Sequence, residues 1–122
     1  MKEDIRVYVI GPLRTGGDMF VGTRNAIDAA ETLMQMGFIP FVPHLDSFWH
    51  LVYVHPEEFW LKWDFAWIRT CHAAFRLSGD SNGGDKEEKF AKKLGIPVFR
   101  RMTDLVKWRK KCLKQKTPRN SR

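Results

Sequence analysis

The sequence predicts a three-layer α/β fold of the flavodoxin or Rossmann-like type, with a parallel sheet of four to five strands and helices on both faces. Short apolar runs, rich in β-branched and aromatic residues, alternate with longer segments of helical apolar spacing. This alternation is typical of parallel sheets, because parallel strands need a crossover helix. The expected strands are residues 5–10, 38–42, 73–77 and 96–100.

Capping residues delimit the expected helices. Asp18 is a suitable N-cap for a helix over 19–36, which Gly37 ends. Pro56 suits the first turn of a second helix over 57–70. A third helix, over 84–94, ends at Gly95.

The remaining segments are assigned in the same way. Thr103 is the expected N-cap of a last helix that ends near Lys114. Residues 43–55 form a long connection, and connections of this length are often functional. Pro40 places the second strand at an edge of the sheet. The chain is thus expected to form a single domain over 1–115, followed by a basic disordered tail over 116–122.

The net charge of +7 is concentrated near the C-terminus. Residues 1–99 hold 11 Lys/Arg and 13 Asp/Glu, a balance of −2, whereas residues 100–122 hold 10 Lys/Arg and one acid, a balance of +9. A basic tail can attract nucleic acid, and it can equally be a solvated terminal helix, which we favour.

The rest of the composition excludes several classes of protein. No apolar run is long enough to span a membrane, and the N-terminus does not resemble a signal peptide. Two isolated cysteines give no disulfide framework or zinc knuckle. We therefore expect a cytoplasmic protein with no membrane contact.

Residues 81–87, Ser-Asn-Gly-Gly-Asp-Lys-Glu, join the third expected strand to the third expected helix. In a parallel sheet this junction lies in the crevice where ligands bind. Backbone N–H groups at Gly83 can approach an anion, and Ser81 offers a hydroxyl. Glu87, in the first turns of the helix, places a reactive carboxylate beside this cradle. We interpret the next residue, Glu88, as a solvated helix residue.

Two other segments offer matching chemistry. The loop over 11–17 follows the first strand, and its Arg14 can bind a phosphate or carboxylate. Asp64 shares a helical face with Trp60, Trp63 and Trp67, and a carboxylate on such a face is costly unless it is paired or in use. The tryptophans themselves are more often core or subunit contacts than a ligand box.

A metal site is not expected. His44, Asp46, His50 and His55 match no metal-binding spacing, and we interpret His44 as a loop residue near substrate. We also expect no cofactor, since the glycine-rich loops match neither a dinucleotide-binding fingerprint nor a Walker A sequence.

Taken together, four segments resemble the nucleoside 2-deoxyribosyltransferase superfamily. They are similar above all to its small branch of 2′-deoxynucleoside 5′-monophosphate N-glycosidases and short phage or bacterial homologues. The segments lie within residues 5–99 and comprise residues 7–17, 43–44, 64–68 and 81–98. The Ser-x-Gly-x-x-x-Glu spacing of residues 81–87 is the most specific of these features.

The resemblance implies a role for each matching residue. Glu87 corresponds to the catalytic carboxylate at the sugar C1′, Asp64 to the acid that orients the sugar or protonates the leaving base, and Tyr8 to a site tyrosine. The implied substrate-binding residues are Gly11, Pro12, Arg14, Gly16, His44, Ser81 and Gly83. The partner would be a nucleoside or nucleotide, and the site would often be completed in a homodimer or higher homo-oligomer.

The expected function is cleavage of an N-glycosidic bond, by hydrolysis or by transfer of the (deoxy)ribosyl group to another base. Such cleavage passes through an oxocarbenium-like sugar that one carboxylate stabilises while an acid assists the departing base. Two alternatives remain: an inactive nucleotide-sensing module, and a nucleic-acid-associated protein acting through residues 100–122.

Overall fold

The structure, a computed structural model, describes residues 4–13 and 17–120, and the side chains of residues 115–120 are not described. Four parallel strands form one sheet in the order β2-β1-β3-β4. They are β1 (Arg6–Ile10), β2 (Ile39–Phe41), β3 (Ala73–Arg76) and β4 (Val98–Phe99). The predicted α/β fold is therefore confirmed, and Pro40 lies in an edge strand as expected.

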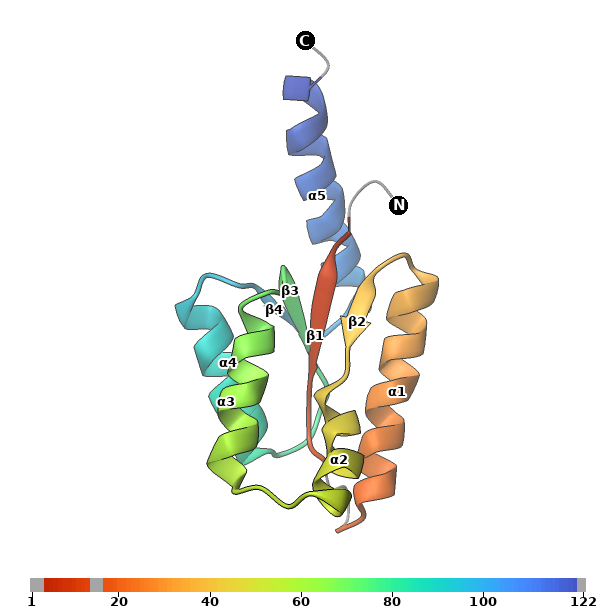
Figure 1. Cartoon of the computed structure of the whole chain (residues 1–122). Coiled ribbons are helices and arrows are strands. Elements are labelled where there is room, and N and C mark those ends of the chain that lie inside the picture. Colours follow the sequence, from red (N-terminus) through yellow and green to blue (C-terminus); the bar gives the residue numbers. More distant parts are fainter. Residues whose placement is uncertain (1–3, 14–16, 121–122) are drawn as a thin grey trace.

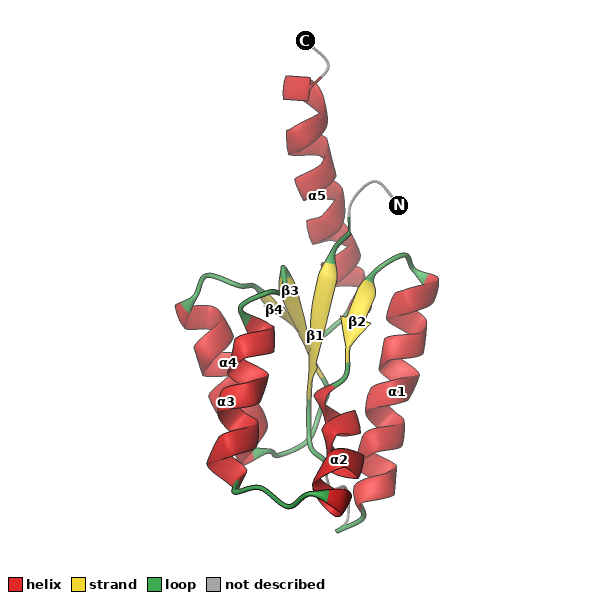
Figure 2. Cartoon of the chain, viewed as in Figure 1, coloured by secondary structure: helices red, strands yellow, loops and turns green. Residues whose placement is uncertain are grey.

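Helices cover both faces of the sheet (Figure 1). They are α1 (Met19–Gln35), η1 (Pro43–Leu45), α2 (Asp46–Val52), α3 (Glu57–Ile68), α4 (Asn82–Lys93) and α5 (Met102–Asn120). Figure 2 shows α1 on one side of the strands, α3 and α4 on the other, α2 beyond the carboxyl ends of the strands, and the far end of α5 extending beyond the body.

Side-chain alternation in β1 divides the core into two clusters. Val7 and Val9 pack with Leu33 of α1 and Leu105 of α5 on one face of the sheet. Tyr8 and Ile10 point to the opposite face, where the cluster includes Ile68 of α3 and Ala91 of α4. Since successive strand residues face opposite sides, this alternation aims Tyr8 at the layer that carries the candidate acids.

Several helix ends follow the predictions. The Asp18 side chain accepts a hydrogen bond of 2.8 Å from the Phe20 amide and caps α1. Gly37 and Gly95 end α1 and α4 in the left-handed conformation, with φ of 93° and 80°. Glycine adopts this conformation without the steric penalty that other residues meet.

Other predicted elements were wrong. Residues 43–55 are not a plain connection, since they contain η1 and α2. Helix α4 begins at Asn82, with Ser81 as its N-cap, and not at Gly84 as predicted. Thr103 is not an N-cap, because α5 begins at Met102 and continues past Lys114 to Asn120. This helix extends into the stretch that was predicted as a disordered tail.

Candidate functional site

A cleft of about 630 Å³ opens at the carboxyl end of the strands. Its walls come from the loop after β1, from η1 and α2, from α3, and from the start of α4. Seven residues predicted from the sequence line it: Gly11, Pro12, His44, Asp64, Ser81, Gly83 and Glu87. Arg14 and Gly16, also predicted, lie outside the described residues.

Glu87 lies on the buried face of α4, together with Gly84 and Ala91 at helical spacing. Its Oε2 accepts a hydrogen bond of 2.8 Å from the hydroxyl of Tyr8. Burial raises the pKa of Glu87, although hydrogen bonds from Asp64 and Tyr8 and the charge of Arg76 oppose that rise. The carboxyl group is thus held at the cleft wall by a fixed donor behind it.

Tyr8 lies behind the cleft and does not line it, since its side chain is fully buried. Phe41 covers the ring, with the two ring centroids 5.7 Å apart. Burial and the neighbouring Glu87 raise the pKa of Tyr8 well above its usual value, so the phenol stays protonated and donates. Tyr8 therefore contacts Glu87 from behind the wall of the cleft.

Asp64 projects from α3 toward Glu87. The stacked rings of Phe65 and Phe90, with centroids 4.0 Å apart, hold α3 against α4. Burial, together with the charge of Glu87, raises the pKa of Asp64 to about 9. Two interacting buried carboxyl groups cannot both ionise at low cost, so the Asp64–Glu87 pair favours sharing one proton.

Asp46 is a third carboxyl group in the cleft, which the sequence interpretation considered only as a metal ligand. It lies in the first turn of α2 and interacts with Asp64. Desolvation by burial raises its pKa, while the hydrogen bond with Asp64 opposes the rise. Among the described residues, Asp46 Oδ2 and Asp64 Oδ1 are buried without a hydrogen-bond partner. A proton shared between the two carboxyl groups would satisfy such oxygens, in agreement with the hydrogen bond between Asp46 and Asp64.

Ser81 and the first residues of α4 form the other side of the cleft. Ser81 Oγ accepts a hydrogen bond of 2.9 Å from the Gly84 amide, which leaves its hydroxyl hydrogen available to a ligand. A side chain at Gly83 would meet nothing within 4 Å, so open space adjoins this backbone. Free amides at a helix start, beside a hydroxyl, favour an anion.

The loop after β1 is held close to η1 and α1. His44 Nε2 lies 3.1 Å from the carbonyl oxygen of Gly11, to which it donates. Burial lowers the pKa of His44 despite the nearby carbonyls of Gly11 and Pro12, so the ring is neutral. A Cβ at Gly22 would lie 1.7 Å from the Leu13 carbonyl oxygen. Glycine at this position of α1 is therefore what lets the loop pack against the helix.

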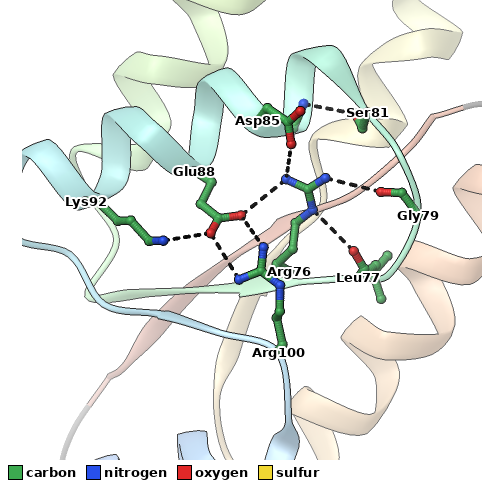
Figure 3. Close-up of polar contacts among 9 residues, drawn as sticks. Arg76, Leu77, Gly79, Ser81, Asp85, Glu88, Lys92 and Arg100 are labelled. Atoms are coloured by element: carbon green, nitrogen blue, oxygen red, sulfur yellow. Dashed lines mark hydrogen bonds and ion pairs between the residues drawn. The ribbon is translucent and has the colours of Figure 1, made fainter.

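Glu88, the residue after Glu87, was predicted to be a solvated helix residue, and this was wrong. It is only 8% exposed and lies among cations (Figure 3). Arg100 donates to both of its oxygens, at 2.8 and 3.0 Å. Arg76, itself buried, lies 3.3 Å from Oε1, and Lys92 lies 3.0 Å from Oε2. These partners outweigh desolvation, and the pKa of Glu88 is lowered.

An aromatic cluster borders the cleft on the side of α2 and α3. Its members are Trp49, His50, His55, Phe59, Trp60 and Trp63. His50, His55 and Trp60 also line the cleft. The sequence interpretation placed Trp60 and Trp63 on one helical face with Asp64, but it gave His50 no role because α2 was not recognised.

No group of three or more His, Cys, Asp or Glu residues in the described parts of the chain is arranged to hold a metal ion. Over the same residues, no helix is both long enough and apolar enough to cross a membrane. Five carboxyl groups line the cleft, those of Asp46, Glu57, Asp64, Asp80 and Glu87, and they are joined by an anion-favouring helix start and an aromatic wall.

Comparison with protein-family models, with curated proteins and with solved structures finds no match to this chain. The fold and the cleft define the class: a three-layer α/β protein with a parallel four-stranded sheet and a carboxyl-rich cleft at its carboxyl edge.

Proposed function

We propose that the protein cleaves the N-glycosidic bond of a (deoxy)nucleoside or nucleoside 5′-monophosphate. The observation that carries this proposal is the pairing of the Glu87 and Asp64 carboxyl groups at the wall of one cleft. Cleavage of such a bond needs a carboxylate near C1′ and a proton donor for the departing base. One proton shared by the two interacting acids would supply both roles, a carboxylate at C1′ and a donor for the base.

In the proposed reaction, Glu87 attacks or stabilises C1′ as the bond to the base breaks. Asp64 gives its proton to the base, which leaves neutral. Tyr8 keeps Glu87 aimed at the cleft through its 2.8 Å hydrogen bond. In a hydrolase, water then adds to C1′ as the bond or contact to Glu87 breaks, and its proton returns to Asp64. In a transferase, a nitrogen of a second base adds to C1′ and gives its proton to Asp64 in the same way.

A 5′-phosphate on the substrate is supported by the start of α4. Ser81 keeps a hydroxyl hydrogen free, and Asn82 and Gly83 line the cleft beside it. Binding energy from a remote phosphate can orient the sugar for reaction. We therefore favour hydrolysis of a monophosphate over base exchange on a nucleoside.

The test is a chromatographic screen of nucleosides and 5′-monophosphates for released base, with and without an added free base. The isosteric variant Glu87→Gln is the blank. Base release by the wild-type protein alone supports hydrolysis, and release that needs the added base supports transfer. If the wild-type protein binds a nucleotide but releases no more base than Glu87→Gln, the protein is a nucleotide sensor instead.

Self-association is a further part of the proposal. Side chains of α2 and the segment after it are exposed and apolar beside the cleft: Phe48, Leu51, Val52, Tyr53 and Val54. Contiguous exposed apolar surface often marks an interface. Sedimentation equilibrium measures the oligomeric state, and a monomer at every concentration would contradict this part.

A second candidate function, binding to a nucleic-acid backbone, is favoured by one face of α5. Lys107, Lys110, Lys111 and Lys114 are exposed and recur at helical spacing. Among the described residues no acid pairs with them, since Asp104 lies near Arg101. Replacing all four by glutamine leaves the buried Leu105 in place. If DNA retention survives this change, or does not weaken with salt, binding to a nucleic-acid backbone through α5 is excluded as the function.

A further inference from the structure

We infer that His50 and Trp60 form a reader of the nucleobase, in which His50 Nε2–H donates a hydrogen bond to an acceptor on the base. This inference rests on the proposed function and specifies how its substrate is selected. It follows from the tautomer that the structure assigns to His50 and from the position of that ring relative to the carboxyl groups.

Two hydrogen-bond donors determine the tautomer of the His50 ring. The indole Nε1–H of Trp60 donates to His50 Nδ1 at 2.9 Å, and the backbone N–H of His55 approaches the same atom at 3.3 Å. An Nδ1 atom that accepts these hydrogen bonds carries no proton. In the neutral imidazole the proton is therefore on Nε2. Trp60 thus fixes His50 as a donor at its other nitrogen.

The position of the His50 ring relative to the carboxyl groups follows from the spacing of residues on α2 and α3. His50 lies four residues after Asp46 on α2, and Trp60 lies four residues before Asp64 on α3. Residues four apart share a helical face, with Cβ atoms about 5–6 Å apart. His50 and Trp60 therefore form the layer next to the Asp46–Asp64 carboxyl pair, and both line the cleft. A purine or pyrimidine ring attached at C1′ spans that distance.

The order of groups across the cleft is consistent with this placement. Asp64 interacts with Glu87 of α4 and with Asp46 of α2, so it stands between the two helices. The anion-favouring start of α4 lies on one side of it, and His50 with Trp60 lies on the other. A nucleotide held with its phosphate at α4 and its C1′ at Glu87 places its base against His50.

The apolar surface on this side suits a flat ring. Leu51 and Leu61 line the cleft next to His50 and Trp60. Small-molecule sites commonly combine apolar walls with a few placed polar groups that fix orientation. Here the apolar walls accept any base, while the donor at His50 favours a base that presents an acceptor, such as a carbonyl oxygen or a ring nitrogen.

The test measures binding without turnover, by calorimetric titration of the Glu87→Gln variant. The probes are 2′-deoxyadenosine, paired with 7-deaza-2′-deoxyadenosine, which lacks the N7 acceptor, and 2′-deoxyuridine, paired with the deoxynucleoside of 2-pyrimidinone, which lacks the O4 acceptor and has an unprotonated N3. Adding His50→Phe should weaken binding of at least one natural nucleoside about 5- to 10-fold, as for one lost hydrogen bond. It should leave the affinity of the matched analogue unchanged.

Two conservative variants of His50 distinguish the effect of its Nε2–H donor from the effect of its side-chain shape. The Gln amide reaches the position of Nε2, so His50→Gln should keep most of the affinity. The Asn side chain reaches only the position of Nδ1, so His50→Asn should lose as much as His50→Phe. Trp49→Phe is the control, because Trp49 belongs to the aromatic cluster but is half-exposed and does not contact His50 Nδ1.

Nitrogen NMR of the His50 ring gives a second readout that needs no ligand. The wild-type protein should show the Nε2–H tautomer, and Trp60→Phe should show a mixture. The inference is overturned by a proton on Nδ1, by a change below 2-fold for every nucleoside in His50→Phe, or by no nucleoside binding. Failure of the proposed function is a different result: nucleosides bind in a His50-dependent manner, yet the wild-type protein releases no base.

Discussion

Glu87 and Glu88 are adjacent residues of the same helix with opposite environments. Glu87 faces the cleft, beside Asp64 and Tyr8, and its pKa is raised. Glu88 faces Arg76, Arg100 and Lys92, and its pKa is lowered. Successive helix positions differ by about 100° in direction, which is enough to move a carboxyl group from one setting to the other. One of the pair is suited to chemistry and the other to stability.

The comparison also shows how the two settings depend on each other. Arg76 lies in β3, and it binds Glu88 and Asp85 at 3.3 and 3.1 Å. These contacts fix the rotation of α4 about its own axis. Because Glu87 is the next residue, the ion pairs of Glu88 also decide that Glu87 points into the cleft.

The largest expected effect is on activity in Glu87→Gln. Base release should fall about 10⁴-fold or more, as in enzymes that lose the group acting on the reacting atom. Thermal stability should be unchanged or higher, because the substitution removes one of the crowded carboxyl groups. Base release and the melting temperature are measured on the same preparation. Activity within 10-fold of wild type would show that Glu87 has no such role.

Asp64→Asn should lower base release about 10²- to 10⁴-fold, the usual contribution of a proton donor. The wild-type rate should also decline as the pH rises through about 9, because Asp64 loses its proton there. A rate profile from pH 5 to 10 checks both expectations. A wild-type profile that stays flat up to pH 10 would assign the proton to another group.

The stability of Asp64→Asn and Glu88→Gln should depend on pH in opposite directions. The folded pKa of Asp64 is raised, so wild-type stability from this group is complete below pH 3.8 and is lost as the pH rises to about 9. Asp64→Asn should therefore become more stable relative to wild type over that range.

For Glu88 the pH dependence of the stabilising effect has the opposite sign. Its folded pKa lies below the usual 4.5, so its stabilising effect is present above that pH and is lost as the pH falls through the folded pKa. Glu88→Gln should cost roughly 2 kcal/mol at pH 7, less than a fully buried pair because Arg100 and Lys92 remain solvated. Denaturant unfolding at pH 3 and 7 measures this difference. Glu58→Gln, an exposed acid of α3, is the control. An equal cost at both pH values would contradict the assignment.

Tyr8→Phe should have the smallest effect, a loss of about 10-fold in base release. The hydroxyl of Tyr8 lowers the pKa of Glu87, so its removal should raise that pKa and move the acidic limb of the rate profile to higher pH. If Tyr8 had a purely structural role, Tyr8→Phe would reduce stability and leave the acidic limb of the rate profile at the same pH. The profile therefore distinguishes positioning from packing.

The sequence was sufficient for the fold and for part of the site, because those features depend on local patterns. Strand and helix periodicity predicted the parallel sheet, and Ser81 and Glu87 followed from spacing within one segment. Asp46 was not recognised as a member of the carboxyl cluster, because α2 lacks capping signals and its side chains are largely exposed. Glu88 was misjudged because its partners Arg76 and Arg100 lie on two different strand ends, a contact that local spacing does not reveal.

The aromatic cluster has an optical consequence. The indole rings of Trp49, Trp60 and Trp63 meet edge to face, with centroids 5.4–6.0 Å apart. Indoles this close share their electronic excitations, which gives paired bands of opposite sign in the circular dichroism spectrum. Since Trp60 lines the cleft, a bound aromatic ring would disturb that pattern. The protein thus carries its own spectroscopic probe of occupancy, without any added dye or label.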